Sequence, residues 1–170
     1  KYLCYNCRSI CNKLEELKEI IAEKKPIMIL LTETWLNDTY PKNYLKIPGY
    51  KTIRKDRSEY IKQHYGKDGG GGIAVIYQEH LKIKLHDNLN TETDESIWFT
   101  AKLNKTNHLY CLVYRPEYID ITTGENKIEE KIIEATNINT NITVIGDLNY
   151  NLLDPNRKTM EAKEMLESWA

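Results

Sequence analysis

The residues best suited to chemistry follow a short apolar stretch near the end of the chain. Residues 142–145 are four β-prone residues that predict a short buried strand, and Gly146 is expected to end it. Asp147 and Asn149 come next, so a carboxylate and a carboxamide should project just beyond the strand. Loops at strand ends often carry functional polar groups over a rigid floor. We therefore predict a polar site at this point.

A second stretch has the same organisation. Residues 27–31 are all apolar, and Thr32 and Glu33 follow them. Two apolar strands that each deliver an acid at their end predict one shared polar site.

Composition sets the broad class. The chain has 170 residues, 41% of them hydrophobic and 29% charged, which is typical of one soluble globular domain spanning residues 1–170. The longest apolar run, residues 27–31, is too short to cross a membrane, and no leader supports secretion. The chain begins with Lys1 and not with methionine, so we expect a piece of a longer protein. A net charge of −1 provides no global attraction to nucleic acid.

Charge is concentrated locally in residues 51–67, which we call the basic segment. It holds six basic residues against Asp56 and Glu59; the basic ones are Lys51, Arg54, Lys55, Arg57, Lys62 and Lys67. Two interpretations stay open, namely an ordinary solvated loop and a loop that faces phosphates.

The cysteines suggest a metal site only superficially. Cys4, Cys7 and Cys11 have a spacing similar to that of zinc or cluster ligands. However, Cys4 falls in a predicted strand, Cys11 borders a helix, and no fourth ligand pattern lies nearby. The pattern favours small, buried apolar side chains.

The first part of the chain predicts a strand–helix–strand unit. Residues 2–6 form the first strand, and a helix runs from Asn12 to about Lys24, with Asn12 and Glu15 as a capping box. Pro26 ends the helix before the strand at residues 27–33. Such a crossover places both strands in one sheet.

The remaining elements are mostly strands. We expect an edge strand at residues 50–54 and a strand at 73–77 opened by the glycine run 69–72, which lacks the Lys-Ser/Thr of a phosphate-binding loop. Half-buried antiparallel strands are expected at residues 81–85 and around 97–99, another strand at 108–114, and helices at 125–136 and from 158 onward. This order predicts two packed sheets with helices outside.

The polar residues at predicted strand ends form one chemical set: Asn6, Glu33, Tyr114, Asp147 and Asn149. A set with only a few acids, together with amides and a phenol, is suited to binding a hard cation and a phosphate. Mg²⁺ takes oxygen ligands and usually only one or two carboxylates. The histidines lack ligand-like spacing, which favours surface or packing positions; they are His64, His80, His86 and His108.

At this point the chain resembles the endonuclease/exonuclease/phosphatase superfamily, and within it the apurinic-endonuclease-like domain of non-LTR (LINE-type) retrotransposons. The matching motifs cover nearly the whole chain in the family's order. They are Asn6-Cys7-Arg8-Ser9, Leu31-Thr32-Glu33-Thr34-Trp35-Leu36, Pro48-Gly49-Tyr50, Arg54-x-Asp56-Arg57, the glycine run into Ile73-Ala74-Val75, Val113-Tyr114-Arg115-Pro116 and Gly146-Asp147-Leu148-Asn149. The Thr-Glu-Thr-Trp-Leu and Tyr-Arg-Pro forms point to the retroelement branch.

The resemblance implies an α/β fold, a four-layer sandwich of two mixed sheets flanked by helices. It implies Mg²⁺-dependent hydrolysis of a DNA phosphodiester, with Mn²⁺ as a substitute, leaving a 3′-hydroxyl that primes reverse transcription. Glu33 and Asn6 would hold the metal, Asp147 would position or deprotonate the attacking water with Asn149 holding it, and Tyr114 would contact the phosphate. The substrate-binding residues would be Arg8, Arg54, Arg57 and Arg115. The implied partners are DNA and a reverse transcriptase domain of the same polypeptide, with no membrane, acting in the nucleus.

The chain departs from the family pattern at one end. The family carries further strands with a closing Asp-His pair, whereas no histidine follows His108 and 21 residues follow Asn149. We expect the last strands to be missing and the activity of this chain alone to be open. The alternatives are a phosphomonoesterase or phospholipase of the same fold, and a non-catalytic DNA-binding remnant.

Overall fold

The computed structural model describes residues 1–66, 69–119, 128–151, 153 and 157–168. Its strands are β1 (Tyr2–Asn6), β2 (Met28–Thr32), β3 (Tyr50–Lys55), β4 (Ile73–Gln78), β5 (Ile83–Leu85), β6 (Glu95–Leu103), β7 (Thr106–Tyr114) and β8 (Ile142–Asp147). Its helices are α1 (Leu14–Lys24), α2 (Glu59–Tyr65), α3 (Ile128–Thr136) and α4 (Arg157–Ser168). No helix of the described part has the length and apolar character needed to cross a lipid bilayer.

The strands form two four-stranded mixed sheets, as the sequence predicts. The first sheet has the order β1-β2-β4-β3 and the second the order β5-β6-β7-β8. In the first sheet β1 and β2 are parallel, which confirms the predicted crossover unit, and β3 is the predicted edge strand. In the second sheet β7 and β8 are parallel and the other pairs are antiparallel.

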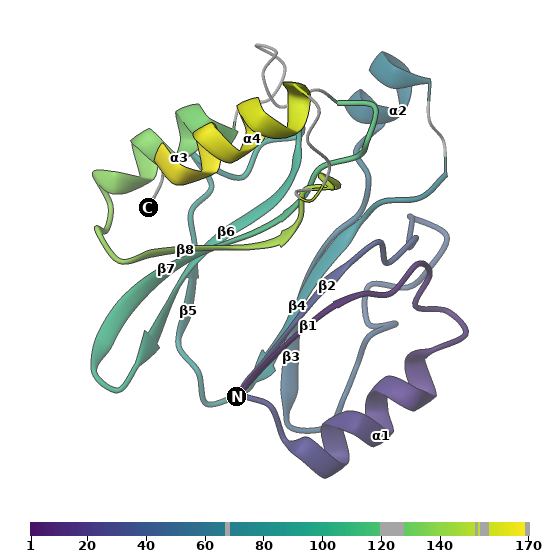
Figure 1. Ribbon diagram of the computed structural model, residues 1–170. Helices are drawn as coiled ribbons and strands as arrows, with labels where there is room; N and C mark the ends of the chain where they lie inside the picture. Colours follow the sequence, from purple (N-terminus) through teal and green to yellow (C-terminus); the bar gives the residue numbers. More distant parts are fainter. Residues whose placement is uncertain (67–68, 120–127, 152, 154–156, 169–170) are drawn as a thin grey trace.

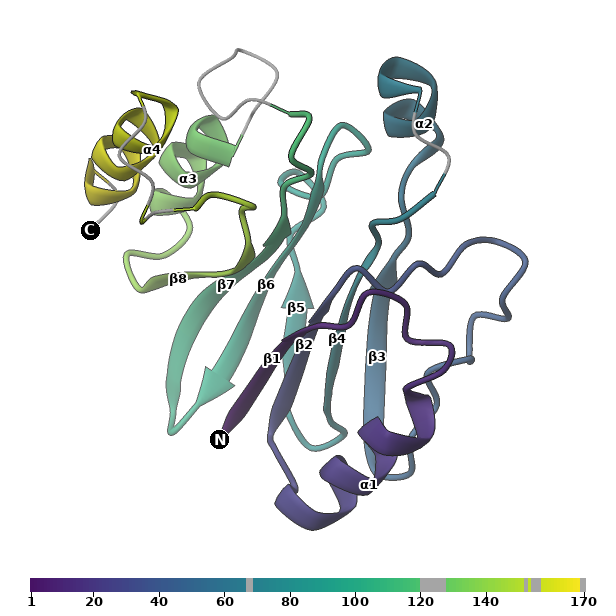
Figure 2. The ribbon, with the colours of Figure 1, turned by 45° about the vertical axis from the view of Figure 1, so that its right-hand side comes forward.

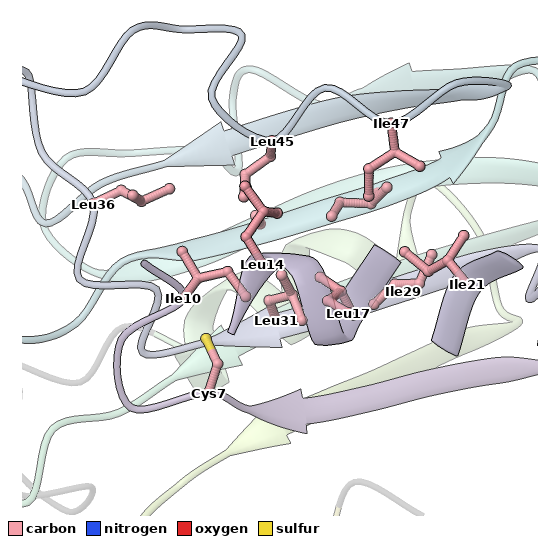
Figure 3. Close-up of a cluster of buried hydrophobic side chains, with 12 residues drawn as sticks. Cys7, Ile10, Leu14, Leu17, Ile21, Ile29, Leu31, Leu36, Leu45 and Ile47 are labelled. Atoms are coloured by element: carbon pink, nitrogen blue, oxygen red, sulfur yellow. The ribbon is translucent and has the colours of Figure 1, made fainter. Parts of the chain in front are cut away.

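The two sheets pack face to face, and helices cover their outer faces (Figures 1 and 2). Side chains of β2 and β4 meet those of β6 and β7 in the central core. On the outside of the first sheet, α1 packs Leu14, Leu17 and Ile21 against Ile29 and Leu31 (Figure 3). On the outside of the second sheet, α3 packs over β6 and β7, with α4 beside it. This arrangement confirms the four-layer sandwich.

Burial follows from these layers. All five residues of β2 are buried, because one face meets α1 and the other meets the second sheet. By contrast, β8 is the edge strand of the second sheet among the described strands, and four of its six residues are only partly buried and two are exposed. The expectation of a buried strand there is wrong. Gly146 does not end the strand either, since it pairs with Val113 inside the ladder.

Three local predictions are wrong for physical reasons. Helix α1 begins at Leu14 after Lys13, and no side chain caps it, so the Asn12 capping box does not form. The basic segment is not a loop: β3 extends to Lys55, and Ser58 caps α2 through its hydroxyl, which accepts from the Ile61 N–H at 3.2 Å. Strand β6 is largely buried rather than half-buried. The predicted start of α3 at residue 125 lies outside the described residues.

The cysteines do not behave uniformly. Cys7 is buried, but Cys4 is exposed and Cys11 is partly buried, so the expectation of buried side chains holds only for Cys7 among these three. The Cys7 thiol donates to the Thr32 carbonyl at 3.0 Å, and burial raises its pKa to about 12. Cys7 is therefore a protonated packing residue at neutral pH.

Candidate active site at the strand ends

Four strand ends converge at one end of the sandwich. Because β1 and β2 are parallel, Asn6 pairs with Thr32, which directly precedes Glu33. Because β7 and β8 are parallel, Tyr114 pairs with Asp147. The packing of the two sheets then brings both pairs together, so the shared polar site expected from the two apolar strands forms.

The side-chain amide of Asn6 links the two acids. Its Nδ2 donates to Glu33 Oε1 at 3.0 Å and to Asp147 Oδ2 at 2.6 Å. One neutral group therefore holds two carboxylates that come from different sheets.

Glu33 has two further neutral partners. The indole of Trp35 donates from Nε1 to Glu33 Oε2 at 3.1 Å. The phenol of Tyr114 lies near Glu33; burial first, and then the charge of Glu33, raise the pKa of Tyr114 well above its usual range. Tyr114 is consequently a neutral donor across the physiological pH range.

Asp147 is held by backbone. The N–H of Asn149 donates to Asp147 Oδ1 at 2.9 Å, and Asn149 has a positive φ of 51°. The side-chain amide of Asn149 donates instead to the Arg115 carbonyl at 2.8 Å. Asn149 thus holds Asp147, as expected, but through its main chain.

Arg115 supports the same loop. Its buried guanidinium donates to the carbonyls of Leu148 at 2.6 Å and Asn149 at 2.9 Å, and it lies over the ring of Tyr150. The sequence assigns Arg115 to substrate binding; the structure gives it contacts that shape the Asp147–Asn149 loop.

The two arginines of the basic segment also have internal partners. Arg54 pairs with Asp56 at 2.6 Å and donates to the carbonyls of Asn37 and Pro41. Arg57 is buried against Glu95 at 2.6 Å. Their expected role in substrate binding stays a prediction that these contacts do not favour. Arg8, in contrast, is exposed beside Asn6, whose Oδ1 accepts from the Arg8 N–H at 3.2 Å.

The donor set fits a magnesium ion. Glu33 and Asp147 are two carboxylates held by an amide N–H, an indole N–H and a backbone N–H. The described residues contain no group of three or more His, Cys, Asp and Glu side chains that could hold a metal ion, so an ion here would need further ligands. Mg²⁺ is usually bound by one or two carboxylates while it keeps several waters.

Sequence reasoning missed the residues that support Glu33. Trp35 belongs to a recognised motif, but its contact with Glu33 was not predicted, and neither was the role of Glu95 behind the glycine run. The order Glu33-x-Trp35 alone was no signal, because side chains two residues apart also touch elsewhere in the chain, as those of Arg54 and Asp56 do.

Comparison with known proteins places the chain in a family. A model of the Endonuclease/Exonuclease/phosphatase family matches residues 3–164. Among solved structures, the endonuclease domain of TRAS1, a telomere-specific non-LTR retrotransposon, is 15% identical with a TM-score of 0.69, covering 99% of this chain and 71% of that one. The AP endonuclease LMAP from Leishmania major is 13% identical with a TM-score of 0.74, covering 98% and 65%.

A third solved structure, the 3′-5′ exonuclease NExo from Neisseria meningitidis, is 13% identical with a TM-score of 0.60, covering 99% of this chain and 71% of that one. No curated protein matches the chain. At these identities the structural likeness shows the shared fold, and the family model carries the assignment. The chain therefore belongs to the endonuclease/exonuclease/phosphatase family of hydrolases.

Proposed function

We propose that this chain is the endonuclease domain of a non-LTR retrotransposon polyprotein, which cleaves a DNA phosphodiester with Mg²⁺ and leaves a 3′-hydroxyl. The observation that carries the proposal is the Asn6 bridge. It holds Glu33 and Asp147 together at the strand ends, with the neutral phenol of Tyr114 beside Glu33. Two adjacent carboxylates with only neutral donors at hand form a site that favours a cation.

The roles of the residues follow from their positions. Glu33 and Asn6 would hold Mg²⁺, or Mn²⁺ in its place, and the ion when bound would polarise the phosphoryl oxygen and stabilise the departing 3′-oxygen. Asp147, held by the Asn149 N–H, would orient or deprotonate the attacking water. Tyr114 would donate its hydroxyl proton as a hydrogen bond to the phosphate.

Two lines support DNA as the substrate. TRAS1, whose domain shares the fold, is a retrotransposon, and a NExo 3′ phosphatase structure with the same fold holds a product DNA hairpin. The Thr-Glu-Thr-Trp-Leu and Tyr-Arg-Pro motifs favour the retroelement branch. In such a polyprotein the 3′-hydroxyl would serve a reverse transcriptase of the same polypeptide in the nucleus.

A phosphomonoesterase is the competing proposal, because the mannosyl-6-phosphatase Bt3783 from Bacteroides thetaiotaomicron also has this fold. The same residues would suit either substrate, so the reaction must be measured. We expect a C-terminally extended form to nick supercoiled plasmid in Mg²⁺ but not in EDTA, with nicks that a DNA polymerase extends directly, and this chain alone to show little nicking. Release of inorganic phosphate from phosphomonoesters, without nicking, would favour the competitor.

Variants make this test specific. Glu33→Gln and Asp147→Asn should lower the nicking rate by at least about 100-fold, since groups that act on one transition state fail together. Glu23→Gln, an exposed acid on α1, is the matched control. The assay should compare this chain with a C-terminally extended form, because the resemblance implies a closing Asp-His pair and no histidine follows His108. Binding of DNA without cleavage by either form would support the non-catalytic remnant.

A further inference from the structure

We propose that Trp35 is a positioning residue for the metal-binding carboxylate of Glu33, and that the buried Arg57–Glu95 pair holds Trp35 in place through the glycine run. This inference rests on the proposed metal site. It adds Trp35 and Glu95, which lie outside the set expected to contact metal or phosphate, and it gives Arg57 a different role.

The first step is the contact between Trp35 and Glu33. The indole N–H of Trp35 donates to Glu33 Oε2 at 3.1 Å, which leaves Oε1 to face the Asn6 amide. Both residues have a positive φ, 54° for Glu33 and 57° for Trp35. Residues other than glycine adopt such angles only where surrounding structure enforces them, and they concentrate at functional sites. The local sequence alone therefore does not explain this geometry.

The second step is the glycine run, which supplies the restraint on the backbone. The N–H of Thr34 donates to the Gly72 carbonyl at 3.0 Å, and the N–H of Trp35 donates to the Gly71 carbonyl at 2.9 Å. Gly71 and Gly72 have φ values of 69° and 80°. A Cβ on Gly72 would lie 2.6 Å from Thr34 Oγ1, so the close approach of the two segments requires glycine.

The third step is the buried pair that fixes the glycine run. Arg57 Nε lies 2.6 Å from Glu95 Oε1, and the other carboxylate oxygen accepts from the Gly72 N–H at 2.6 Å. Arg57 also donates to the Gly69 carbonyl at 2.5 Å. The side chains of Arg57 and Glu95 are 5% and 0% exposed. Burial raises the pKa of Glu95, while Arg57 and the Gly72 N–H favour its ionised form.

The contacts form one continuous path from the second sheet to the metal site. Glu95 begins β6 and Arg57 precedes α2, and both bond to the glycine run before β4. The glycine run in turn bonds to residues 34–35. A Cβ on Gly71 would overlap both the Arg57 guanidinium and the Glu95 carboxylate, which shows how tightly the pair encloses the turn. The path ends on one oxygen of Glu33 and so fixes the orientation of its carboxylate. Residues that orient a metal ligand in this way typically change metal affinity 10–100-fold when replaced.

The experiment uses Trp35→Phe, which keeps the ring and removes the N–H donor. We expect Mn²⁺ affinity, measured by calorimetry, to fall about 10–100-fold while the thermal unfolding temperature stays close to that of the wild type. In the metal-free protein, the indole ¹H–¹⁵N resonance of Trp35, assigned by its loss in Trp35→Phe, should shift in Glu33→Gln. The indole of Trp98 is the internal control, because it is buried in another core and has no partner among the described residues.

A second variant tests the buried pair. Glu95→Gln keeps the shape of the side chain and can still accept from the Gly72 N–H, and Arg57 then lacks its counter-ion. We expect the Trp35 indole resonance to shift and Mn²⁺ affinity to fall, and Glu92→Gln, at an exposed acid before the same strand, is the control. If Glu95→Gln does not fold, Glu95→Asp provides the same two measurements.

The outcomes separate the two proposals. Wild-type Mn²⁺ affinity in Trp35→Phe, with binding abolished in Glu33→Gln, would overturn the positioning role and leave the metal site intact. Absence of Mn²⁺ binding by the wild type would count against the proposed function alone. In that case the Trp35 indole resonance still tests the positioning role. If this resonance does not shift in metal-free Glu33→Gln, the proposed contact between Trp35 and Glu33 is wrong.

Discussion

The amide of Asn6 and the carboxylate of Asp147, 141 positions apart, are joined by a hydrogen bond of 2.6 Å that crosses from one sheet to the other. The same nitrogen also donates to Glu33. Asn6 therefore connects the two sheets and neutralises no charge while it does so. Any group that replaces it must satisfy two carboxylates at once.

Replacing Asn6 with aspartate tests this balance. Asn6→Asp replaces the amide donor with a third carboxylate beside those of Glu33 and Asp147. We therefore expect the free energy of unfolding in EDTA to fall by about 1–3 kcal/mol. Mg²⁺ should restore part of that loss, because a ligand that binds only the folded state stabilises it. Urea unfolding with and without Mg²⁺ measures both effects. Asn43→Asp, at an exposed position, should show neither.

Glu33 should dominate metal binding. Glu33 and Asp147 each have neutral donors on both oxygens, and Glu33 is the one proposed to bind the ion directly. Removal of one of two carboxylates sharply weakens a Mg²⁺ site. Calorimetric titration of Mn²⁺ should give at least about tenfold weaker binding to Glu33→Gln than to the wild type. Equal affinities would contradict the assignment of Glu33 as the principal ligand.

Gly146 should tolerate no side chain. Its φ is 151°, and a Cβ there would overlap the Val113 carbonyl on the neighbouring strand. We expect Gly146→Ala to cost about 1–3 kcal/mol and to displace Asp147, the next residue. Gly69→Ala is the control, because a Cβ at Gly69 meets nothing within 4 Å. Equal unfolding temperatures for the two variants would show that β8 adjusts without cost.

Much of the site could be predicted because parallel strands carry their last residues to one edge. The apolar runs before Glu33 and Asp147 identify two strand ends, and the ordered motifs identify the other members. No such sequence pattern predicts the conformation of the segments that connect the strands. The short helix α2 is hidden in a charged segment, although Ser58 and the αL residue Gly66 at its ends are a cap signal that could have located it.

Buried charge was the least predictable feature. Arg57 is 38 positions from Glu95, and no periodicity connects them. Six basic residues in one segment therefore left only a solvated loop and a phosphate-facing loop as interpretations. The structure instead gives Arg54 a bidentate contact with Asp56, gives Arg57 a buried partner, and brings Lys55 within 3.8 Å of Asp94. These basic side chains therefore form ion pairs and hydrogen bonds within the protein itself.

Arg54 provides the test of that conclusion. Arg54→Ala should cost about 1–3 kcal/mol of stability, because Asp56 and the Asn37 and Pro41 carbonyls lose a charged donor. Lys51→Ala, at an exposed position of the same strand, should change stability by less than about 0.5 kcal/mol. The salt dependence of DNA binding by folded Arg54→Ala should match that of the wild type. If the slope of log K against log salt concentration falls by about one in Arg54→Ala, Arg54 contacts a DNA phosphate after all.

His86 should make stability fall in mild acid. Burial first, and then the nearby charge of Lys84, lower its pKa below the usual 6.5, while Asp87 opposes the change. Its Nε2 lies 2.7 Å from Thr100 Oγ1. The unfolded chain therefore takes up a proton near pH 6.5 that the folded chain does not accept, so this contribution to stability is full above pH 6.5 and is lost below it. Urea unfolding between pH 7.5 and 5.5 should show a smaller decrease for His86→Gln than for the wild type. The exposed His80→Gln is the control, and an identical pH dependence in all three proteins would show that His86 protonates without cost in the folded state.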